Sequence, residues 1–164
     1  GLEAFTQLLN ALPTDTGMAF VLVQHLHPDF HSALTEILSR ETSMPVSEIQ
    51  DRTQVAPNHV YVIPPSADLQ LMHGKLHLLL RKAHELTMPI DRFFRSLAAD
   101  QGGRAIGVIL SGTASDGVLG LKAIKAEGGI TFAQDEATAK YDGMPHSAIA
   151  AGVVDFVLGF RAAP

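Results

Sequence analysis

Apolar residues recur along this chain with two different periods, and their pattern predicts helices that alternate with short strands. Residues 2–12 carry leucine and phenylalanine at three- and four-residue spacing, which is typical of a helix with one apolar face. Residues 19–24 form a short, partly β-branched apolar run, which favours a buried strand. A helix over residues 32–42 and a strand over 46–49 continue the series.

The middle of the chain departs from this alternation. Residues 60–63 form an apolar strand candidate that ends at two prolines. Two further apolar runs, 69–72 and 76–80, lie on either side of His73-Gly74-Lys75, a sequence typical of a tight turn. We therefore expect an antiparallel hairpin excursion near residues 60–80.

From residue 91 onward the alternation returns. The pattern predicts a helix that contains Phe93, Phe94 and Leu97, strands over 105–110, 130–133 and 153–157, and helices over 118–127 and around 146–151. Strands that alternate with helices predict an α/β fold, here a doubly wound and mainly parallel sheet with helices on both faces. No repeat or linker-like segment divides residues 1–164, so we expect a single domain.

The first predicted helix starts without a recognisable N-terminal signal. No Ser, Thr, Asp or Asn precedes Leu2, and Gly1 stands where the preceding turn is expected. We therefore expect the domain to be truncated just before Gly1.

Composition and charge narrow the classes of function. The 12 Lys and Arg residues against 17 Asp and Glu give a formal net charge of −5, which argues against nucleic acid as a partner. The chain has no cysteine, which excludes disulfides, thiolate metal sites and a cysteine nucleophile. Its apolar runs are about five residues long, against the roughly 20 that a membrane helix needs, and no secretory signal opens it. We expect no membrane insertion and a cytoplasmic location.

Two polar residues follow predicted strands closely. His25 comes directly after the strand over 19–24, and Asp116 lies in the Gly-containing loop 111–117 that follows the strand over 105–110. Because the carboxyl ends of parallel strands meet at one edge of a sheet, we expect the two side chains to lie within hydrogen-bond reach. A carboxylate that orients a histidine, which in turn activates a nucleophile, forms two-thirds of a hydrolytic triad.

The third member of such a triad is not evident in these residues. No serine stands in a Gly-x-Ser-x-Gly elbow, and Ser111, Ser115 and Ser147 are more simply explained as turn or cap residues. A nucleophile elbow consists of a strand, a tight turn that carries the serine, and a helix. Since this chain opens with a glycine and a helix, we expect the serine just upstream of Gly1.

Five segments then resemble one known family over nearly the whole chain. They are Val21-Leu22-Val23-Gln24-His25, Val60-Tyr61-Val62-Ile63-Pro64-Pro65, the loop from Ile109 to Gly117, Gln134-Asp135-Glu136 and Gly143-Met144-Pro145. In this order and spacing they resemble the CheB-type protein-glutamate methylesterase domain.

The resemblance implies a doubly wound serine hydrolase that removes methyl groups from glutamyl methyl esters in the cytoplasmic helices of chemoreceptors, some members also deamidating glutamine. His25 and Asp116 match the family's triad histidine and aspartate. The family's serine lies in a Gly-Ala-Ser-x-Gly-Gly turn whose last glycine matches Gly1, so the chain as written is expected to be essentially inactive. No cofactor is expected, and Gly112, Thr113 and Met144 are expected to bind substrate or form the wall of the site.

The match to the family departs in two informative places. Thr113 stands where the family usually has a methionine beside the active site. The family's usual His-Arg-Pro-Ser-Val-Asp stretch is shortened here to Met88-Pro89-Ile90-Asp91, so a receptor contact of that basic segment is not carried over. The loop and the Ile-Pro-Pro turn look more like the methylesterase half of hybrid proteins, so a methyltransferase domain of the same parent protein is a further expected partner.

Two other interpretations stay open at this stage. The cluster His25, His27, Asp29 and His31 offers ligands for a metal-dependent hydrolase. The extra residue Phe30 puts it out of register with the familiar metallo-hydrolase pattern, and Pro28 indicates a turn that leads to the next helix. A non-catalytic module that binds a partner through the same fold is the other alternative.

Overall fold

The computed structural model describes residues 2–25, 33–82 and 85–160. Its helices are α1 (Leu2–Ala11), α2 (Leu34–Ser39), α3 (Pro89–Gln101), the short 3-10 helix η1 (Gly102–Arg104), α4 (Val118–Ala126) and α5 (Gly143–Ala150). Its strands are β1 (Phe20–Leu22), β2 (Val46–Glu48), β3 (Thr53–Gln54), β4 (Val60–Val62), β5 (Ala67–Met72), β6 (Lys75–Leu80), β7 (Ile106–Ile109), β8 (Ile130–Gln134) and β9 (Phe156–Leu158).

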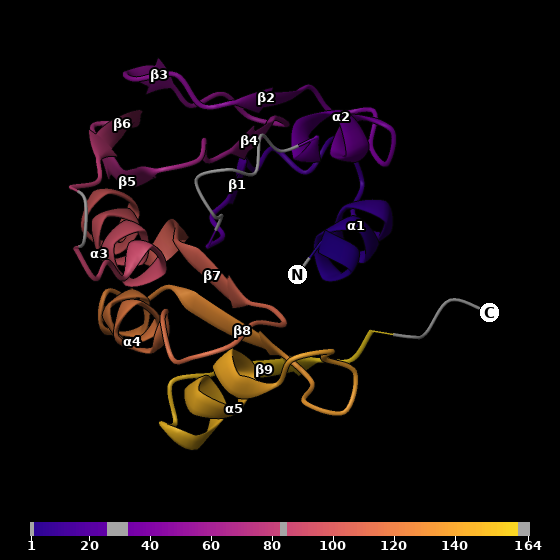
Figure 1. Cartoon of the computed structure of the whole chain (residues 1–164), viewed down its shortest axis with the longest axis vertical. Coiled ribbons are helices and arrows are strands. Elements are labelled where there is room, and N and C mark those ends of the chain that lie inside the picture. Colours follow the sequence, from indigo (N-terminus) through magenta and orange to yellow (C-terminus); the bar gives the residue numbers. More distant parts are fainter. Residues whose placement is uncertain (1, 26–32, 83–84, 161–164) are drawn as a thin grey trace.

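The described strands form three small sheets rather than one continuous sheet (Figure 1). Two sheets are parallel, with strand orders β1-β4-β2 and β7-β8-β9, and the third is antiparallel with the order β3-β6-β5. The mixed α/β character agrees with the sequence pattern. The division of the parallel strands between two separate sheets does not follow from that pattern.

The antiparallel excursion lies where the sequence indicates it. β5 and β6 pair from Ala67↔Leu80 to Met72↔Lys75, and the turn between them consists of His73 and Gly74. Both turn residues have positive φ, 51° and 72°, which matches the right-handed twist of a two-residue hairpin. The hairpin packs its apolar side against α3, with Leu69 and Leu76 fully buried.

Two apolar clusters hold the layers together. One joins α1, α2 and the first parallel sheet through Leu9, Leu38, Val60 and their neighbours. The other, which is larger, joins the hairpin, α3, α4, α5 and the second parallel sheet. No helix in the part of the chain that the structure describes is long and apolar enough to cross a membrane.

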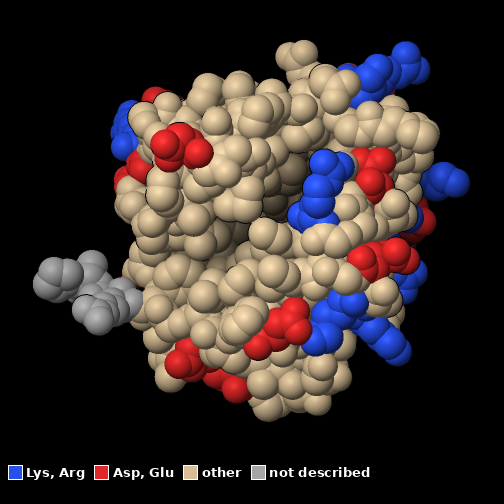
Figure 2. Space-filling model, turned by 180° about the vertical axis from the view of Figure 1, so that it is seen from behind, with Lys and Arg blue, Asp and Glu red and all other residues tan. Residues whose placement is uncertain are grey.

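The two faces of the β7-β8-β9 sheet differ in exposure. Gly107 lies directly under α4, because a Cβ atom there would be 2.7 Å from the side chains of Leu121 and Ile124. On the opposite face of the sheet, away from α4, the side chains of Ile106 (40%), Ile130 (42%) and Phe156 (57%) are exposed. Seen from behind, the molecule has a hollow near its centre, and mostly uncharged atoms surround it (Figure 2).

The last third of the chain shows where the element boundaries differ from the pattern. The helix expected around residues 146–151 begins at Gly143, since Pro145 is tolerated in a first turn. The strand expected over 153–157 forms only at Phe156–Leu158, because Val153 packs into the core while Asp155 bonds to Thr131.

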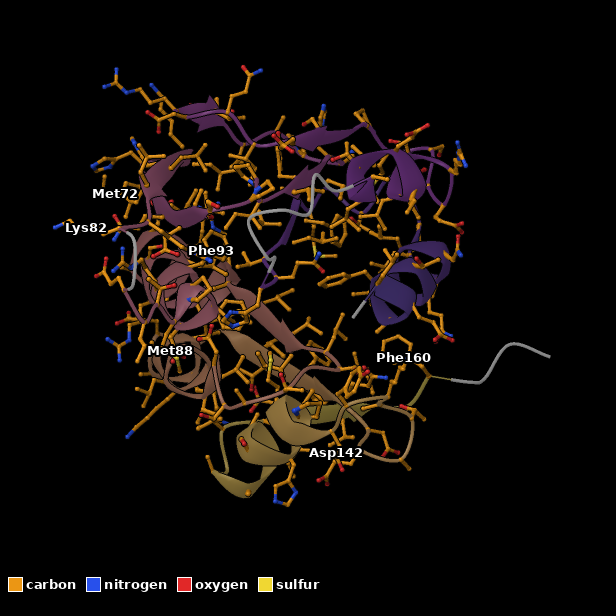
Figure 3. All side chains as sticks on the ribbon, viewed as in Figure 1. Met72, Lys82, Met88, Phe93, Asp142 and Phe160 are labelled. Carbon is orange, nitrogen blue, oxygen red and sulfur yellow. The ribbon has the colours of Figure 1, made fainter. Side chains whose placement is uncertain are left out.

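The hairpin end and the C-terminal end of the chain lie on opposite sides of the molecule. Met72 and Lys82 are on one side, and Phe160, close to the C-terminus, is on the other (Figure 3).

Candidate active site

A cavity of about 530 Å³ opens at the carboxyl ends of β1 and β7. Its walls come from α1, β1, β7, the loops that follow these strands, and the start of α3 and α5. The lining residues are Phe5, Val21, Val23, Gln24, His25, Ile90, Phe94, Val108, Ile109, Leu110, Ser111, Gly112, Thr113, Ala114, Tyr141 and Met144. Its position at strand ends is the usual place for a ligand in an open α/β sheet.

The structure brings His25 and Asp116 into direct contact. The Nε2 atom of His25 lies 2.9 Å from Oδ2 of Asp116, although the residues are 91 positions apart in the chain. The imidazole is 46% exposed and the carboxylate is 1% exposed. The arrangement therefore presents a solvent-accessible ring on a buried negative group.

Asp116 is held by backbone groups as well as by His25. Its Oδ2 accepts the N–H of Ile90 and its Oδ1 accepts the N–H of Asp91, both at 2.9 Å. Burial alone raises the pKa of Asp116, but the hydrogen bonds from His25 and from these two N–H groups outweigh it and hold the pKa below its usual value. The carboxylate is thus kept ionised, as a group that supports an imidazolium requires.

The loop after β7 is fixed by backbone contacts with the segment before α5. The N–H of Gly112 donates to the carbonyl of Tyr141, and the N–H of Met144 donates to the carbonyl of Gly112, both at 2.9 Å. The side chain of Gln134 accepts the N–H of Ser111 at 2.8 Å. Ala114 has a positive φ of 76°, so the loop holds a non-glycine residue in the left-handed region at the cavity wall.

The three residues expected at the site wall all line the cavity. Gly112, Thr113 and Met144 stand side by side there. A Cβ atom on Gly112 would lie 2.5 Å from the sulfur of Met144, so the glycine is what allows the thioether to pack this closely.

Two cavity residues are not recognisable as site residues from the sequence pattern. Phe5 belongs to the apolar stripe of α1, which predicts core packing, and Tyr141 lies in an irregular segment before α5. Gln134 is different, because it belongs to one of the family-like segments, but its contact with Ser111 becomes evident only in three dimensions.

The hydroxyl groups of Ser111 and Ser147 are hydrogen-bonded to backbone groups. The Oγ of Ser111 accepts the backbone N–H of Tyr141 at 2.9 Å, and the Oγ of Ser147 donates to the carbonyl of Gly143 at 2.8 Å. The Ser147 contact spans one helical turn, as expected for this residue, whereas the Ser111 contact joins segments that lie 30 residues apart.

The metal-site alternative is largely outside the described structure. His27, Asp29 and His31 fall in residues 26–32, which are not described. Among residues 2–25, 33–82 and 85–160, no group of three or more His, Cys, Asp or Glu side chains could hold a metal ion.

Comparisons with known proteins agree on one protein family. A family model described as CheB methylesterase matches residues 1–163. The crystal structure of the Thermotoga maritima CheB methylesterase catalytic domain superposes with a TM-score of 0.86 and 30% sequence identity, over 97% of this chain and 87% of that one.

Curated relatives include members of the same family, and they are longer than this chain. A protein-glutamate methylesterase/protein-glutamine glutaminase of Photorhabdus laumondii is 35% identical over 163 residues, which cover 96% of this chain and 46% of that protein. An uncharacterized 104.1 kDa protein of Rhodobacter capsulatus is 44% identical over 128 residues, 78% of this chain and 13% of that protein. The chain thus spans less than half the length of these relatives.

Proposed function

The chain belongs to the CheB methylesterase family, and we propose that it supplies the histidine and the aspartate of a serine-type protein-glutamate methylesterase. The observation that carries this proposal is the 2.9 Å hydrogen bond between His25 and Asp116 beside the cavity. A buried carboxylate that holds one ring nitrogen fixes the tautomer and stabilises the imidazolium. The other ring nitrogen can then act as a general base.

The nucleophile of this proposal is a serine in residues that precede Gly1 in the parent protein. β1 and β7 are edge strands among the described residues, and both contribute side chains to the same cavity. A further parallel strand that pairs with these edges would bring the residue at its carboxyl end close to His25. Ser111 also lines the cavity, but its hydroxyl oxygen already accepts the N–H of Tyr141, which suits a structural role.

The proposed reaction is a two-step acyl transfer. His25 takes the proton of the serine at Nδ1 while the serine oxygen attacks the carbonyl carbon of a glutamyl methyl ester. The proton then passes to the leaving oxygen, methanol departs and an acyl-enzyme remains. Water next transfers a proton to His25 and attacks the acyl carbon. His25 then returns this proton to the serine oxygen as the bond to the acyl carbon breaks, which releases the glutamate carboxyl and the free serine. Backbone N–H groups at the start of α1 are proposed to stabilise the oxyanion in both steps.

Gly112, Thr113 and Met144 are proposed to form the wall against which the ester packs. All three line the cavity, and the absence of a side chain on Gly112 lets the Met144 thioether pack against the loop. Thr113 presents a hydroxyl where the family resemblance leads one to expect a methionine, so the wall is more polar here.

The proposed substrates and setting follow the family. We assign methylated glutamates in the cytoplasmic helices of chemoreceptors as the substrate, with glutamine deamidation as a second activity, since curated relatives carry both in their names. A methyltransferase domain of the same parent protein is the proposed partner, and the large size of the Rhodobacter relative leaves room for further domains. The proposed location is cytoplasmic.

A fluorophosphonate probe tests the position of the nucleophile. We expect the probe to label a serine upstream of Gly1 in the full-length parent protein and to leave the 164-residue chain unlabelled. His25→Ala is expected to abolish labelling, whereas His59→Ala is a matched control, because His59 is absent from the cavity wall and bonds to the carbonyl of Pro57. Labelling of Ser111 in the 164-residue chain would move the nucleophile into these residues and overturn this part of the proposal.

Methanol release tests the reaction itself. The full-length protein is expected to release methanol from a methylated chemoreceptor fragment, and Asp116→Asn is expected to lower kcat by about 10⁴-fold, as in other triads. The 164-residue chain is expected to show at most the residual rate that binding and oxyanion stabilisation supply, about 10³–10⁴ over water. A full-length protein without any ester hydrolysis would instead favour the non-catalytic binding module.

A further inference from the structure

Asp91 is a buried carboxylate next to the His25–Asp116 pair. It is 5% exposed and lies in the first turn of α3. Its Oδ1 atom accepts the backbone N–H of Gly117 at 3.0 Å and that of Gly120 at 2.7 Å. These N–H groups belong to the N-terminus of α4, and an α-helix has no internal partners for them.

The two aspartates cap each other's helices. Asp116 precedes α4 and accepts the N–H groups of Ile90 and Asp91 at the start of α3. Asp91 in α3 accepts N–H groups at the start of α4. The residues at the usual capping positions, Met88 and Gly117, make no side-chain cap hydrogen bond. Figure 3 labels Met88, which precedes α3, and Phe93, which lies in its second turn.

These reciprocal hydrogen bonds require α3 and α4 to approach closely. A Cβ atom on Gly120 would lie 2.5 Å from Cβ of Phe94 and 3.2 Å from Cα of Asp91. Gly117, which follows Asp116, has a φ of +103°, a conformation that other residues rarely adopt. The backbone next to Asp116 therefore has an unusual conformation that a hydrogen bond from Gly117 to Asp91 holds in place.

We propose that Asp91 is a positioning residue of the active site: by holding the N-terminus of α4 it aims Asp116 at His25. This inference rests on the proposed function for its catalytic meaning. Nothing in the reaction requires Asp91 to contact substrate, and it is absent from the residues that line the cavity.

The physical argument concerns what happens when the acceptor is lost. Removal of the Asp91 carboxylate leaves the N–H groups of Gly117 and Gly120 buried and without their acceptor, which favours a shift of the loop toward other partners. Because Oδ2 of Asp116 is shared between His25 and Ile90, such a shift lengthens the contact with the imidazole. A displacement of about 1 Å in a catalytic group can lower the rate about 10²-fold.

The first arm of the test needs no nucleophile. The ring nitrogen chemical shifts of His25 in the ¹⁵N-labelled 164-residue chain, recorded at pH 9, report which nitrogen carries the proton and whether it is hydrogen-bonded. We expect Asp91→Ala to change these shifts toward those of Asp116→Ala. Asp91→Asn retains an oxygen for the N–H groups of Gly117 and Gly120, and is expected to leave the shifts as in the wild type.

A matched control separates positioning from general loss of stability. Asp155 accepts the N–H and hydroxyl of Thr131 and pairs with Lys125, and it is absent from the cavity wall, so Asp155→Ala removes hydrogen bonds to a carboxylate without contact to the site. It is expected to lower thermal stability while the His25 shifts stay unchanged. If Asp91→Ala does not fold, Asp91→Glu replaces it, since it keeps the charge but moves the acceptor by one methylene, and the same change is expected.

The second arm uses the full-length protein and a methylated receptor fragment. Asp91→Ala is expected to lower kcat about 10²-fold with KM within about threefold, and Asp91→Asn is expected to restore most of the loss. Wild-type shifts and kcat in Asp91→Ala, an Asn variant as impaired as the Ala variant, or altered shifts in Asp155→Ala would each overturn the proposal. If the wild-type protein hydrolyses no ester, the proposed function fails, while the shifts still decide the role of Asp91.

Discussion

Asp116 engages His25 through the Nε2 atom of the imidazole ring, at 2.9 Å, so proton transfer at this ring has to use Nδ1. The oxygen that meets the ring, Oδ2, is also the acceptor for the backbone N–H of Ile90 at 2.9 Å. The candidate catalytic pair is therefore anchored to the N-terminus of α3, and changes that affect this helix end affect the pair.

Replacement of Asp116 by Asn should destabilise the protein more at pH 7 than at pH 3. Burial raises the pKa of Asp116, but the hydrogen bonds it accepts outweigh burial and hold the pKa below 3.8. Because the folded value lies below the unfolded one, the ionised group stabilises the fold above the unfolded value, and this contribution is lost as the pH falls through the folded value. Urea unfolding of both proteins at the two pH values measures the difference, and an equal gap at both would contradict it.

Replacement of Asp91 by Asn should show the opposite dependence. Burial is the largest influence on Asp91 and, with the negative charge of Asp116, it raises the pKa above 3.8 despite the N–H groups of Gly120 and Gly117. The folded state then disfavours the ionised form, so the wild type loses stability relative to the Asn variant as the pH rises through the folded value. The same urea series checks this, and parallel curves for Asp91→Asn and Asp116→Asn would be incompatible with it.

Replacement of Gly120 by Ala should separate α3 from α4. The new Cβ atom would lie 2.5 Å from Cβ of Phe94, an atom next to the backbone that cannot rotate away. We expect a net loss of about 1–2 kcal/mol in the free energy of unfolding, because overpacking of about 1–3 kcal/mol exceeds the gain of up to about 1 kcal/mol from alanine's helix propensity.

Gly103→Ala is the control for this change. The nearest atom to its added Cβ is 3.6 Å away, an ordinary contact, so the free energy of unfolding should change by less than about 0.5 kcal/mol. Chemical denaturation of both variants gives the comparison, and a Gly120→Ala protein as stable as Gly103→Ala would show that the helices can adjust.

The two arginines that contact Asp68 should differ in their contribution to stability. Asp68 is buried, Arg81 Nε lies 2.8 Å from its Oδ1 and is 20% exposed, and Arg92 Nη1 lies 3.3 Å from its Oδ2 and is 40% exposed. Removing the close partner of a buried charge costs about 3 kcal/mol, whereas a longer and more exposed pair contributes about 1 kcal/mol or less. Thermal unfolding of Arg81→Ala and Arg92→Ala should show the larger loss for Arg81, and the reverse order would contradict the geometric argument.

The positions of the helices and strands follow closely from local patterns. The stripe of apolar residues in α1 predicts its span to within a residue, and the His73-Gly74 turn predicts the β5–β6 hairpin. Predictions are poorer near β9, because an apolar run such as the one at Val153 shows that residues are buried without showing whether they pair in a sheet.

Some residues of the candidate site can be recognised in the sequence and others cannot. His25 and Asp116 are recognisable because each follows a strand, and the family-like segments around them give the same positions. Asp91 lies in the shortened family-like stretch, but that stretch does not indicate a role at the site, since an acidic residue in a first helical turn is common for reasons of the helix dipole alone. Its role becomes evident only through its contacts with Gly117 and Gly120.

The sequence by itself determined the order and type of most elements, although not β3 or η1, together with the strand ends that carry His25 and Asp116, and the family. The tertiary structure decided that the parallel strands form two sheets, that the two side chains meet across 91 positions, and that Asp91 and Asp116 cap each other's helices. Hydrophobic periodicity is a local property that reports which side of an element is buried. Pairing of edges and hydrogen bonds between distant residues depends on how the buried faces pack, and the pattern along the chain does not contain that information.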